Sequence, residues 1–305
     1  MITPPDIPAW LARLYPFSPR KVLTPGGASM SYLDEGPRSD EAVLMLLGNP
    51  KWSFYYRDLV HALAPTMRCI APDHIGMGLS AKPQDYRYTL GQRIADIEAL
   101  VATLKLKRVH LVVHDWGGAI GFGFAARYPE LIGRIVILNT AAFASPHIPA
   151  RIALCKLPLL GPLLVRGANG FAWPATWMAM HARKLSADEK RAYLFPYDSW
   201  AHRAAVSAFV QDIPLGESHP SWRTLQEVEQ GLAEFQDRPV LVRWGGRDFC
   251  FNDRFLARWR EIFPQADVQR LPEAGHYVLE DARATIVPDI TRFFFVSGEV
   301  GPSRP

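Results

Sequence analysis

Asp115 is the residue whose surroundings say most about chemistry. It lies at the centre of the sequence VHDWGG at 113–118, directly after the apolar run 109–113 and before a stretch rich in Gly and Ala. This pattern predicts a sharp turn from a buried strand into a helix, which presents its central side chain at the edge of a sheet. A carboxylate held there can attack an sp³ carbon and form an ester with it. The alternative is that Asp115 only caps the helix.

His276 and Asp248 could complete a catalytic triad with Asp115. Asp248 follows an apolar run at 240–244, and His276 follows a further expected strand at 268–271. The order nucleophile, acid, histidine is the order found in α/β-hydrolases. In this arrangement His276 activates water or assists the breakdown of an ester, and Asp248 orients the imidazole. Taken singly, each residue is more often structural, but their order and their positions after strands together favour catalysis.

The distribution of acidic residues supports the choice of Asp248. Residues 131–187 contain no Asp or Glu, so no carboxylate can follow the strand expected at 135–138, where some proteins of this kind place the acid. His114 is a competing base beside Asp115. Because successive side chains at the end of a strand point to opposite sides, we assign His114 to packing.

Asn49 and Trp116 could supply hydrogen-bond donors close to Asp115. Asn49 follows the apolar run 43–47 in the sequence GNP, and Trp116 comes directly after Asp115. An amide N–H and an indole N–H together suit a halide, a carboxylate or an oxyanion. The alternative roles are turn formation for Asn49 and core filling for Trp116. These residues call for neither a metal nor an organic cofactor.

Positioning these residues requires an α/β fold with a mostly parallel sheet. Short, almost wholly apolar runs predict strands that are covered on both faces, and they fall at 43–47, 69–71, 109–113, 135–138 and 240–242. The strand pattern of the fifth run continues to 244, and a last strand is expected at 268–271. Helical patterns at 55–63, 90–104 and 116–127 alternate with the strands, and Thr89 can cap the second helix. This alternation implies right-handed crossovers, with helices on both faces of the sheet.

Residues 141–215 interrupt the alternation of strands and helices. They show no strand pattern, and their proline-broken segments have helical character at 148–156, 172–181, 186–194 and 200–210. We therefore expect one α/β core, made of residues 1–140 and 216–305, with a helical cap inserted at 141–215. An insertion at the carboxyl edge of the strands would lie over the ligand site.

Composition excludes several classes of protein. The 305 residues are 49% hydrophobic and 21% charged, which excludes a disordered chain or a coiled coil. The formal charge of +4 comes without a dense basic tract, so no nucleic-acid partner is expected. Three cysteines without paired spacing and no signal-peptide pattern at residues 1–17 fit a cytoplasmic protein. The apolar run 157–165 is too short to span a bilayer.

The expected cap is both apolar and basic. Leu, Phe, Trp and Met side chains are crowded between 154 and 180, and residues 141–210 carry a net charge of +5. Such a surface could admit long alkyl chains and lie on an anionic membrane as a peripheral contact. The alternative is that the apolar side chains pack against the core while the charges are solvated.

These motifs resemble the haloalkane dehalogenase group of α/β-hydrolases, in particular its third subfamily. The resemblance covers nearly the whole chain, and its segments are Asn49-Pro50, APDHIGMG at 71–78, HDWGG at 114–118 and Gly275-His276. Other segments resemble the OleB family, the β-lactone decarboxylases of bacterial long-chain olefin biosynthesis. These segments lie at 139–143, 197–200, 211–215, 248–251 and 275–281.

The resemblance implies an activity and a set of roles. The family converts a cis-3,4-dialkyl β-lactone into a cis-alkene and carbon dioxide, in an assembly with the pathway's β-lactone synthetase and reductase that is associated with membrane. Carried over residue by residue, Asp115 is the nucleophile, His276 the histidine and Asp248 its partner. Asn49 and Trp116 would stabilise negative charge on the lactone oxygen. Whether Asp115 attacks the lactone carbonyl or the ring carbon stays open at this point.

Three other functions stay open beside this one. A haloalkane dehalogenase would use the same residues to form and hydrolyse an alkyl-enzyme ester. An epoxide hydrolase would need two cap tyrosines, and Tyr193 and Tyr197 are separated by Pro196. A binding protein or scaffold on this fold would not need the complete triad. Leu47 also departs from the family, which usually has a histidine there that shapes the neighbouring loop.

Overall fold

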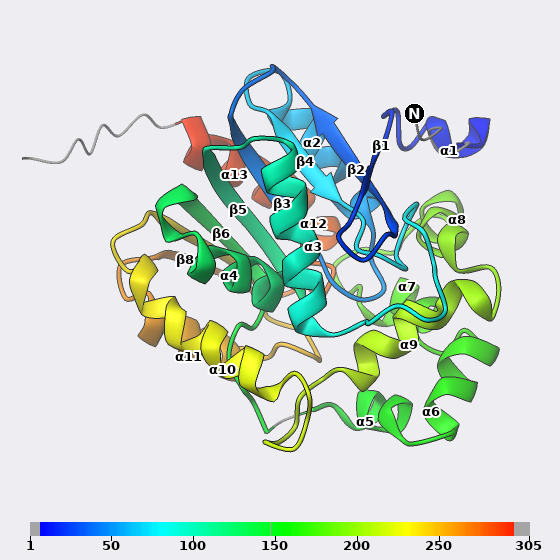
Figure 1. Ribbon diagram of the computed structural model, residues 1–305. Helices are drawn as coiled ribbons and strands as arrows, with labels where there is room; N and C mark the ends of the chain where they lie inside the picture. Colours follow the sequence, from blue (N-terminus) through cyan, green and yellow to red (C-terminus); the bar gives the residue numbers. More distant parts are fainter. Residues whose placement is uncertain (1–6, 147, 296–305) are drawn as a thin grey trace, which may run out of the picture.

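A single sheet of eight strands organises the described part of the chain. The structure, a computed structural model, describes residues 7–146 and 148–295, and the strand order is β1-β2-β4-β3-β5-β6-β7-β8 (Figure 1). β2 pairs antiparallel with β1 and with β4, and all other neighbours are parallel. The expected α/β architecture is confirmed. The strands are β1 Arg20–Leu23, β2 Ser29–Glu35, β3 Glu41–Leu46, β4 Cys69–Pro72, β5 Arg108–Asp115, β6 Ile132–Thr140, β7 Val240–Gly245 and β8 Asp267–Leu271.

The six predicted strands are β3 to β8, whereas no sequence pattern predicts β1 and β2. Their sequences, RKVL and SMSYLDE, mix polar and apolar residues. They form the antiparallel edge of the sheet, and such strands need no continuous apolar run. Residues 1–6 and 296–305, which belong to the two expected core segments, lie outside the described residues.

Helices cover both faces of the sheet because alternate side chains of each strand point in opposite directions. Leu44 and Leu46 of β3 pack on the side of α3, α4, α10 and α11, while Val43 and Met45 pack on the side of α2, α12 and α13. The helix bounds are α1 Ala9–Ala12, α2 Arg57–Leu63, α3 Leu90–Thr103, α4 Gly117–Arg127, α10 Trp222–Gly231, α11 Asp253–Ile262, α12 Val278–Asp281 and α13 Arg283–Phe295.

The predicted helix boundaries agree closely with these bounds. The Thr89 side chain accepts a hydrogen bond from the Gln92 amide at the start of α3, as predicted for its cap. The helix expected at 55–63 begins as a 3₁₀ turn at Ser53–Tyr56 and continues as α2.

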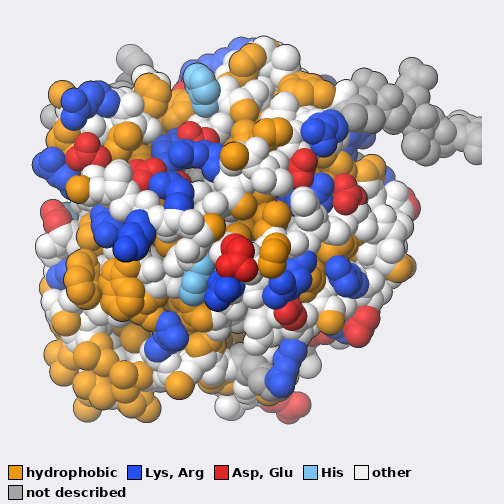
Figure 2. Space-filling view, turned by 180° about the vertical axis from the view of Figure 1, so that it is seen from behind, with side chains coloured by type: hydrophobic (Ala, Val, Ile, Leu, Met, Phe, Trp, Pro, Cys, Tyr) orange, Lys and Arg blue, Asp and Glu red, His pale blue; other side chains and the backbone are white. Residues whose placement is uncertain are grey.

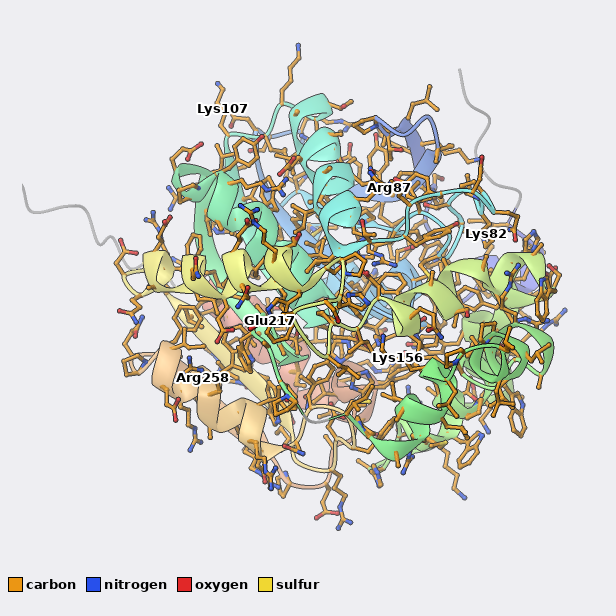
Figure 3. All side chains as sticks on the ribbon, turned by 60° about the horizontal axis from the view of Figure 1, so that its bottom comes forward. Lys82, Arg87, Lys107, Lys156, Glu217 and Arg258 are labelled. Atoms are coloured by element: carbon orange, nitrogen blue, oxygen red, sulfur yellow. The ribbon has the colours of Figure 1, made fainter. Side chains whose placement is uncertain are left out.

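The chain between β6 and α10 forms the helices that lie beyond the carboxyl edge of the sheet (Figure 1). The described residues between 141 and 215, called the cap here, contain helices and turns without a strand. Lys156 joins two of these helices, because its ammonium donates to the carbonyls of Val210 and Gln211 (Figure 3). The helical segments are α5 Ala150–Lys156, α6 Leu160–Pro162, a π-helical turn at Leu163–Gly167, α7 Ala172–Met178, α8 Ala187–Leu194 and α9 Ala204–Gln211.

One part of the cap surface is strongly apolar. Figure 2 shows a dense group of hydrophobic side chains at the lower left, where the cap lies, with Lys and Arg side chains nearby. Seven large hydrophobic side chains between 154 and 177 are exposed on the cap, and we call them the cap patch: Leu154, Leu157, Leu159, Leu160, Leu163, Trp173 and Trp177. Among the described residues no helix combines the length and the apolar character needed to cross a membrane.

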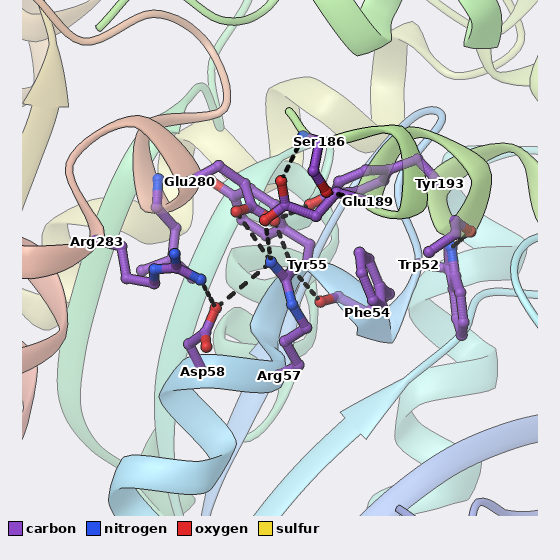
Figure 4. A network of polar contacts seen from close by, with 12 residues as sticks. Trp52, Phe54, Tyr55, Arg57, Asp58, Ser186, Glu189, Tyr193, Glu280 and Arg283 are labelled. Carbon is purple, nitrogen blue, oxygen red and sulfur yellow. Dashed lines mark hydrogen bonds and ion pairs between the residues drawn. The ribbon is translucent and has the colours of Figure 1, made fainter. Parts of the chain in front are cut away.

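A buried charge network fixes the cap to the core (Figure 4). Glu280 at α12 accepts two hydrogen bonds from Arg57 of α2, at 2.5 and 3.1 Å. From the cap, Tyr193 donates to Glu280 at 2.6 Å, and Arg183 pairs with both Glu280 and Glu189. Two helices of the core and one of the cap therefore share a single carboxylate that is almost fully buried.

Candidate active site

Asp115 lies on a tight turn at the carboxyl end of β5. Its backbone φ is +56°, in the left-handed region that a residue with a side chain rarely adopts, and α4 begins two residues later. A Cβ atom on Gly117 would lie 2.1 Å from the Leu46 carbonyl oxygen, so this turn needs glycine there. The Trp116 amide donates to Asp115 Oδ1 at 2.6 Å. The strained turn and the backbone hydrogen bond together therefore fix the position of the carboxylate at the strand end.

The structure brings Asp115, His276 and Asp248 into direct contact. His276 Nδ1 donates to Asp248 Oδ2 at 2.8 Å, and His276 Nε2 lies 3.0 Å from Asp115 Oδ2. Asp248 in turn accepts hydrogen bonds from the backbone amides of Cys250 and Phe251. The three side chains are buried, so the geometry is that of a nucleophile, a base and an orienting acid.

Charges inside the site set the ionisation of Asp115 and His276. Burial alone would raise the pKa of the Asp115 carboxyl, but Lys51 and His276 outweigh it and hold that pKa well below its ordinary value. Burial alone would lower the pKa of His276, but Asp248 and Asp115 outweigh this effect together, and the pKa is raised. Asp115 is therefore ionised and ready to act as a nucleophile at neutral pH.

Lys51 is a further residue of the site, and none of the sequence motifs predicts its place there. Its side chain is fully buried, and Nζ lies 2.7 Å from Asp115 Oδ2 and 3.3 Å from His276 Nε2. The residue directly follows Asn49-Pro50 and precedes the buried segment 52–56, in which four of the five residues are aromatic. The signal in the sequence is a lysine next to a run of aromatic residues that are expected to be buried. A lysine buried with them needs a charged partner, because lysine is almost never fully buried without one.

Asn49 and Trp116 both line the cavity beside Asp115. Asn49 Nδ2 donates to the Val206 carbonyl of α9 at 2.9 Å. An amide nitrogen carries two N–H groups, so this bond leaves one of them for a ligand. The Trp116 ring packs edge-on against Phe209, with 5.7 Å between the ring centroids. The two predicted donors thus stand at the same cavity, and one of them also supports the cap.

Two other histidines near the site have structural contacts. His114 Nε2 lies 2.8 Å from the His276 carbonyl oxygen, and its ring stacks on Tyr55. Burial holds the pKa of His114 well below its ordinary value, so its ring is neutral. His74 Nε2 lies 2.9 Å from the Leu47 carbonyl oxygen, so His74 supports the backbone of the loop that begins at Leu47.

A cavity of about 380 Å³ lies between the core and the cap, within the size range of small-molecule sites. Its polar end contains Asp115 and His276, and its walls are mostly apolar. The apolar walls include side chains from three cap elements and from the loop after β7, such as Ile152, Leu164, Met178, Phe249 and Phe251. The ionised Asp115 carboxylate therefore faces an apolar cavity.

The two cap tyrosines make contacts away from this cavity. Tyr193 donates to Glu280, and the Tyr197 hydroxyl accepts a hydrogen bond from the Gly78 amide. Both side chains are buried, and neither belongs to the cavity lining. The protonation of an epoxide oxygen by two tyrosines is therefore not supported by the geometry.

The fold and the elbow that carries Asp115 define the class of protein. The sequence profile of the alpha/beta hydrolase fold family matches residues 41–282, which includes the whole candidate site. The chain belongs to this family.

Particular relatives narrow the classification further. The chain is 46% identical to a cis-3-alkyl-4-alkyloxetan-2-one decarboxylase of Shewanella oneidensis, over 93% of this chain and 90% of the relative. It is 44% identical to the protein of that name from Xanthomonas campestris, over 92% and 96% of the two chains. Within the hydrolase-fold family it therefore groups with these decarboxylases, as the OleB resemblance implies. The crystal structure of haloalkane dehalogenase DbeA from Bradyrhizobium elkani matches with a TM-score of 0.81 at 27% identity, covering 90% and 96%.

Proposed function

We propose that this protein decarboxylates cis-3,4-dialkyl β-lactones to cis-alkenes and carbon dioxide. The observation that carries the proposal is the carboxylate triad at the end of an apolar cavity, in a chain 46% identical to a named decarboxylase of these lactones. The apolar walls suit two alkyl substituents, and the ionised Asp115 suits attack on an electrophilic carbon.

In the first step, Asp115 attacks C4 of the lactone, the ring carbon bonded to the ring oxygen. The C4–O bond breaks, and its electron pair stays on the oxygen, which becomes part of a free carboxylate on C3. Asn49 and Trp116 stand at the cavity with N–H groups that can receive this developing charge. The product of the step is an ester between Asp115 and the opened substrate.

In the second step, the ester collapses without water. The bond between C3 and the free carboxylate breaks, its electron pair forms the C3=C4 double bond, and the C4–O bond to Asp115 breaks. Carbon dioxide leaves, and Asp115 recovers its charge. Inversion at C4 followed by anti elimination returns a cis-alkene from a cis-lactone. Every atom is accounted for without a redox partner or a cofactor.

Attack at the lactone carbonyl would not lead to the alkene so directly. It would form an anhydride with Asp115 and leave the former ring oxygen attached to C4 as an alkoxide. Since the alkene carries no oxygen on C4, that bond would still have to break, and an alkoxide oxygen is a very poor leaving group. We therefore place the attack at C4.

A side-by-side assay separates this function from dehalogenation. Wild-type protein is expected to form alkene from a synthetic cis-β-lactone and to release halide from 1,2-dibromoethane at least ~100-fold more slowly. The two reactions have only the attack by Asp115 in common. Gas chromatography and halide detection measure the two products. Halide release without alkene would contradict the proposal and favour a haloalkane dehalogenase.

We further propose that the cap patch contacts an anionic membrane, which would supply long-chain substrates. Leu159 is 84% exposed, and Trp173 and Trp177 are each more than half exposed. The cap also carries a net charge of +5 over residues 141–210. Exposed Trp and Leu beside basic residues are the features of an interfacial membrane contact. The same surface is available to the β-lactone synthetase and reductase that the family resemblance implies as partners.

The membrane proposal predicts a measurable loss of binding in a cap variant. Replacing Trp173 and Trp177 by serine removes two exposed aromatic side chains and should weaken binding roughly tenfold. Co-sedimentation with vesicles of phosphatidylglycerol and phosphatidylcholine measures it, and Leu23→Ser, exposed on β1, is the control. Equal binding of both variants, or wild-type protein that ignores anionic vesicles, would contradict the contact.

A further inference from the structure

Lys51 lies at the centre of the site but takes no part in the two steps proposed for the reaction. Its ammonium carries three N–H groups, and three acceptors surround it. They are Asp115 Oδ2 at 2.7 Å, His276 Nε2 at 3.3 Å and the Asn49 carbonyl at 3.4 Å. The ammonium also lies 5.1 Å from the centre of the Tyr277 ring.

Lys51 influences the reaction through its contacts with Asp115 and His276 and not through contact with the substrate. The side chain is fully buried, and it does not belong to the cavity lining although Asp115 and His276 do. A buried positive charge at this distance from Asp115 acts in a medium of low dielectric, where charges interact more strongly than in water. Whatever changes the charge on Asp115 therefore changes the environment of Lys51.

The ester on Asp115 has two possible fates, and Lys51 affects them in opposite ways. In elimination, the Asp115 oxygen leaves with its electron pair, and the ammonium stabilises the returning negative charge. In hydrolysis, His276 Nε2 must accept a proton from water, as a base does in a hydrolase. An ammonium N–H directed at Nε2 competes for the same lone pair, and its positive charge opposes formation of an imidazolium.

We propose that Lys51 commits the ester on Asp115 to elimination and suppresses its hydrolysis, so that a hydrolase-type triad produces an alkene. This inference rests on the proposed lactone decarboxylation and adds the residue that selects between its two products. Elimination gives an alkene and carbon dioxide, whereas hydrolysis of the same ester gives a 3-hydroxy acid. The ratio of these products is thus the direct readout of the role of Lys51.

Lys51→Met is the variant that tests this role, because methionine keeps the length of the side chain without the charge. We expect alkene formation to fall at least ~10-fold and the 3-hydroxy acid to change from a trace to a main product. Gas chromatography of both products from one cis-β-lactone reaction gives their ratio, which does not depend on the amount of folded protein. Lys82→Met is the control, since Lys82 is a partly buried lysine that donates to the Gly78 and Ser80 carbonyls outside the site (Figure 3).

Intact-protein mass spectrometry provides a second, independent readout. In Lys51→Met protein the ester should break down mainly by hydrolysis, which we expect to be slower than elimination in the wild type, so quenched Lys51→Met protein should show added mass equal to one lactone. Wild-type and Lys82→Met protein should show none. Lys51→Gln serves in the same two assays if the methionine variant does not fold, as judged by its thermal unfolding.

The outcomes separate this inference from the proposed function. Wild-type protein that makes no alkene overturns the decarboxylation itself. Wild-type protein that makes alkene, with a Lys51 variant that keeps the same rate and the same product ratio, overturns only the role of Lys51. Wild-type protein that releases mainly 3-hydroxy acid also overturns it, because Lys51 is then present and hydrolysis is not suppressed.

Discussion

Replacing Asp115 by alanine should abolish alkene formation, with a loss on the order of 10⁴-fold or more, as found when a covalent nucleophile is removed from a triad. The carboxylate forms the bond to C4 in the proposed mechanism, and neither His276 nor Asp248 can take its place. Gas chromatography of products from a cis-β-lactone measures the effect. Asp85→Ala, which removes an exposed carboxylate, should keep full activity. More than about a tenth of the activity in Asp115→Ala would contradict the assigned role.

The same substitution should also reveal the ion pair with Lys51. Asp115→Ala leaves the Lys51 ammonium buried without its carboxylate partner, and breaking such a pair usually costs about 3–5 kcal/mol of stability. Asp115→Ala combined with Lys51→Met removes both charges, so we expect it to be more stable than Asp115→Ala alone. Stability is measured by urea unfolding of the variants.

Replacing Glu280 by alanine should have a large effect on stability, because Glu280 is the shared acceptor of a buried network. Glu280 accepts hydrogen bonds from Arg57 and Tyr193 and pairs with Arg183. Its removal leaves a buried guanidinium and a buried hydroxyl without their acceptor, so we expect a loss of roughly 3–5 kcal/mol in the free energy of unfolding. Urea unfolding followed by circular dichroism measures this loss.

Glu273 provides the control for Glu280. It pairs with Arg247 on the surface, where both side chains are more than half exposed, and Glu273→Ala should change stability by less than ~1 kcal/mol. Since the Glu280 network joins α8 of the cap to α2 and α12 of the core, the Glu280 variant should also expose the cap to proteolysis before the core. Equal stability of the two variants would show that the network does not hold the cap.

The sequence predicts the parts of the site that depend on local patterns. Asp115 is the last residue of β5, Asp248 follows the end of β7 within three residues, and His276 follows the end of β8 within five residues. Because parallel strands end at the same edge of a sheet, these three side chains can be placed together without coordinates. The helix boundaries agree for a similar reason, as Thr89 shows, since a cap and its helix are neighbours in sequence.

Features that depend on distant contacts could not be predicted in this way. Lys51 stands in a loop, where a lysine is normally solvated, and its burial follows from contacts with Asp115 and His276, far away in sequence. The engagement of Asn49 with Val206 likewise requires the cap to be in place. The strands β1 and β2 mix polar and apolar residues and lack the apolar runs that identify β3 to β7.

The central claim is that Asp115 forms an ester at C4 and that this ester collapses without water. Many turnovers of a cis-β-lactone in water enriched in ¹⁸O, followed by mass spectrometry of the peptide that contains Asp115, test it most directly. Hydrolysis of the alkyl ester by attack of water on the Asp115 carboxyl carbon would place ¹⁸O in its carboxylate, whereas elimination would not. We predict cis-alkene as the product and an unlabelled Asp115. A labelled Asp115 in a reaction that forms alkene would contradict the proposed mechanism.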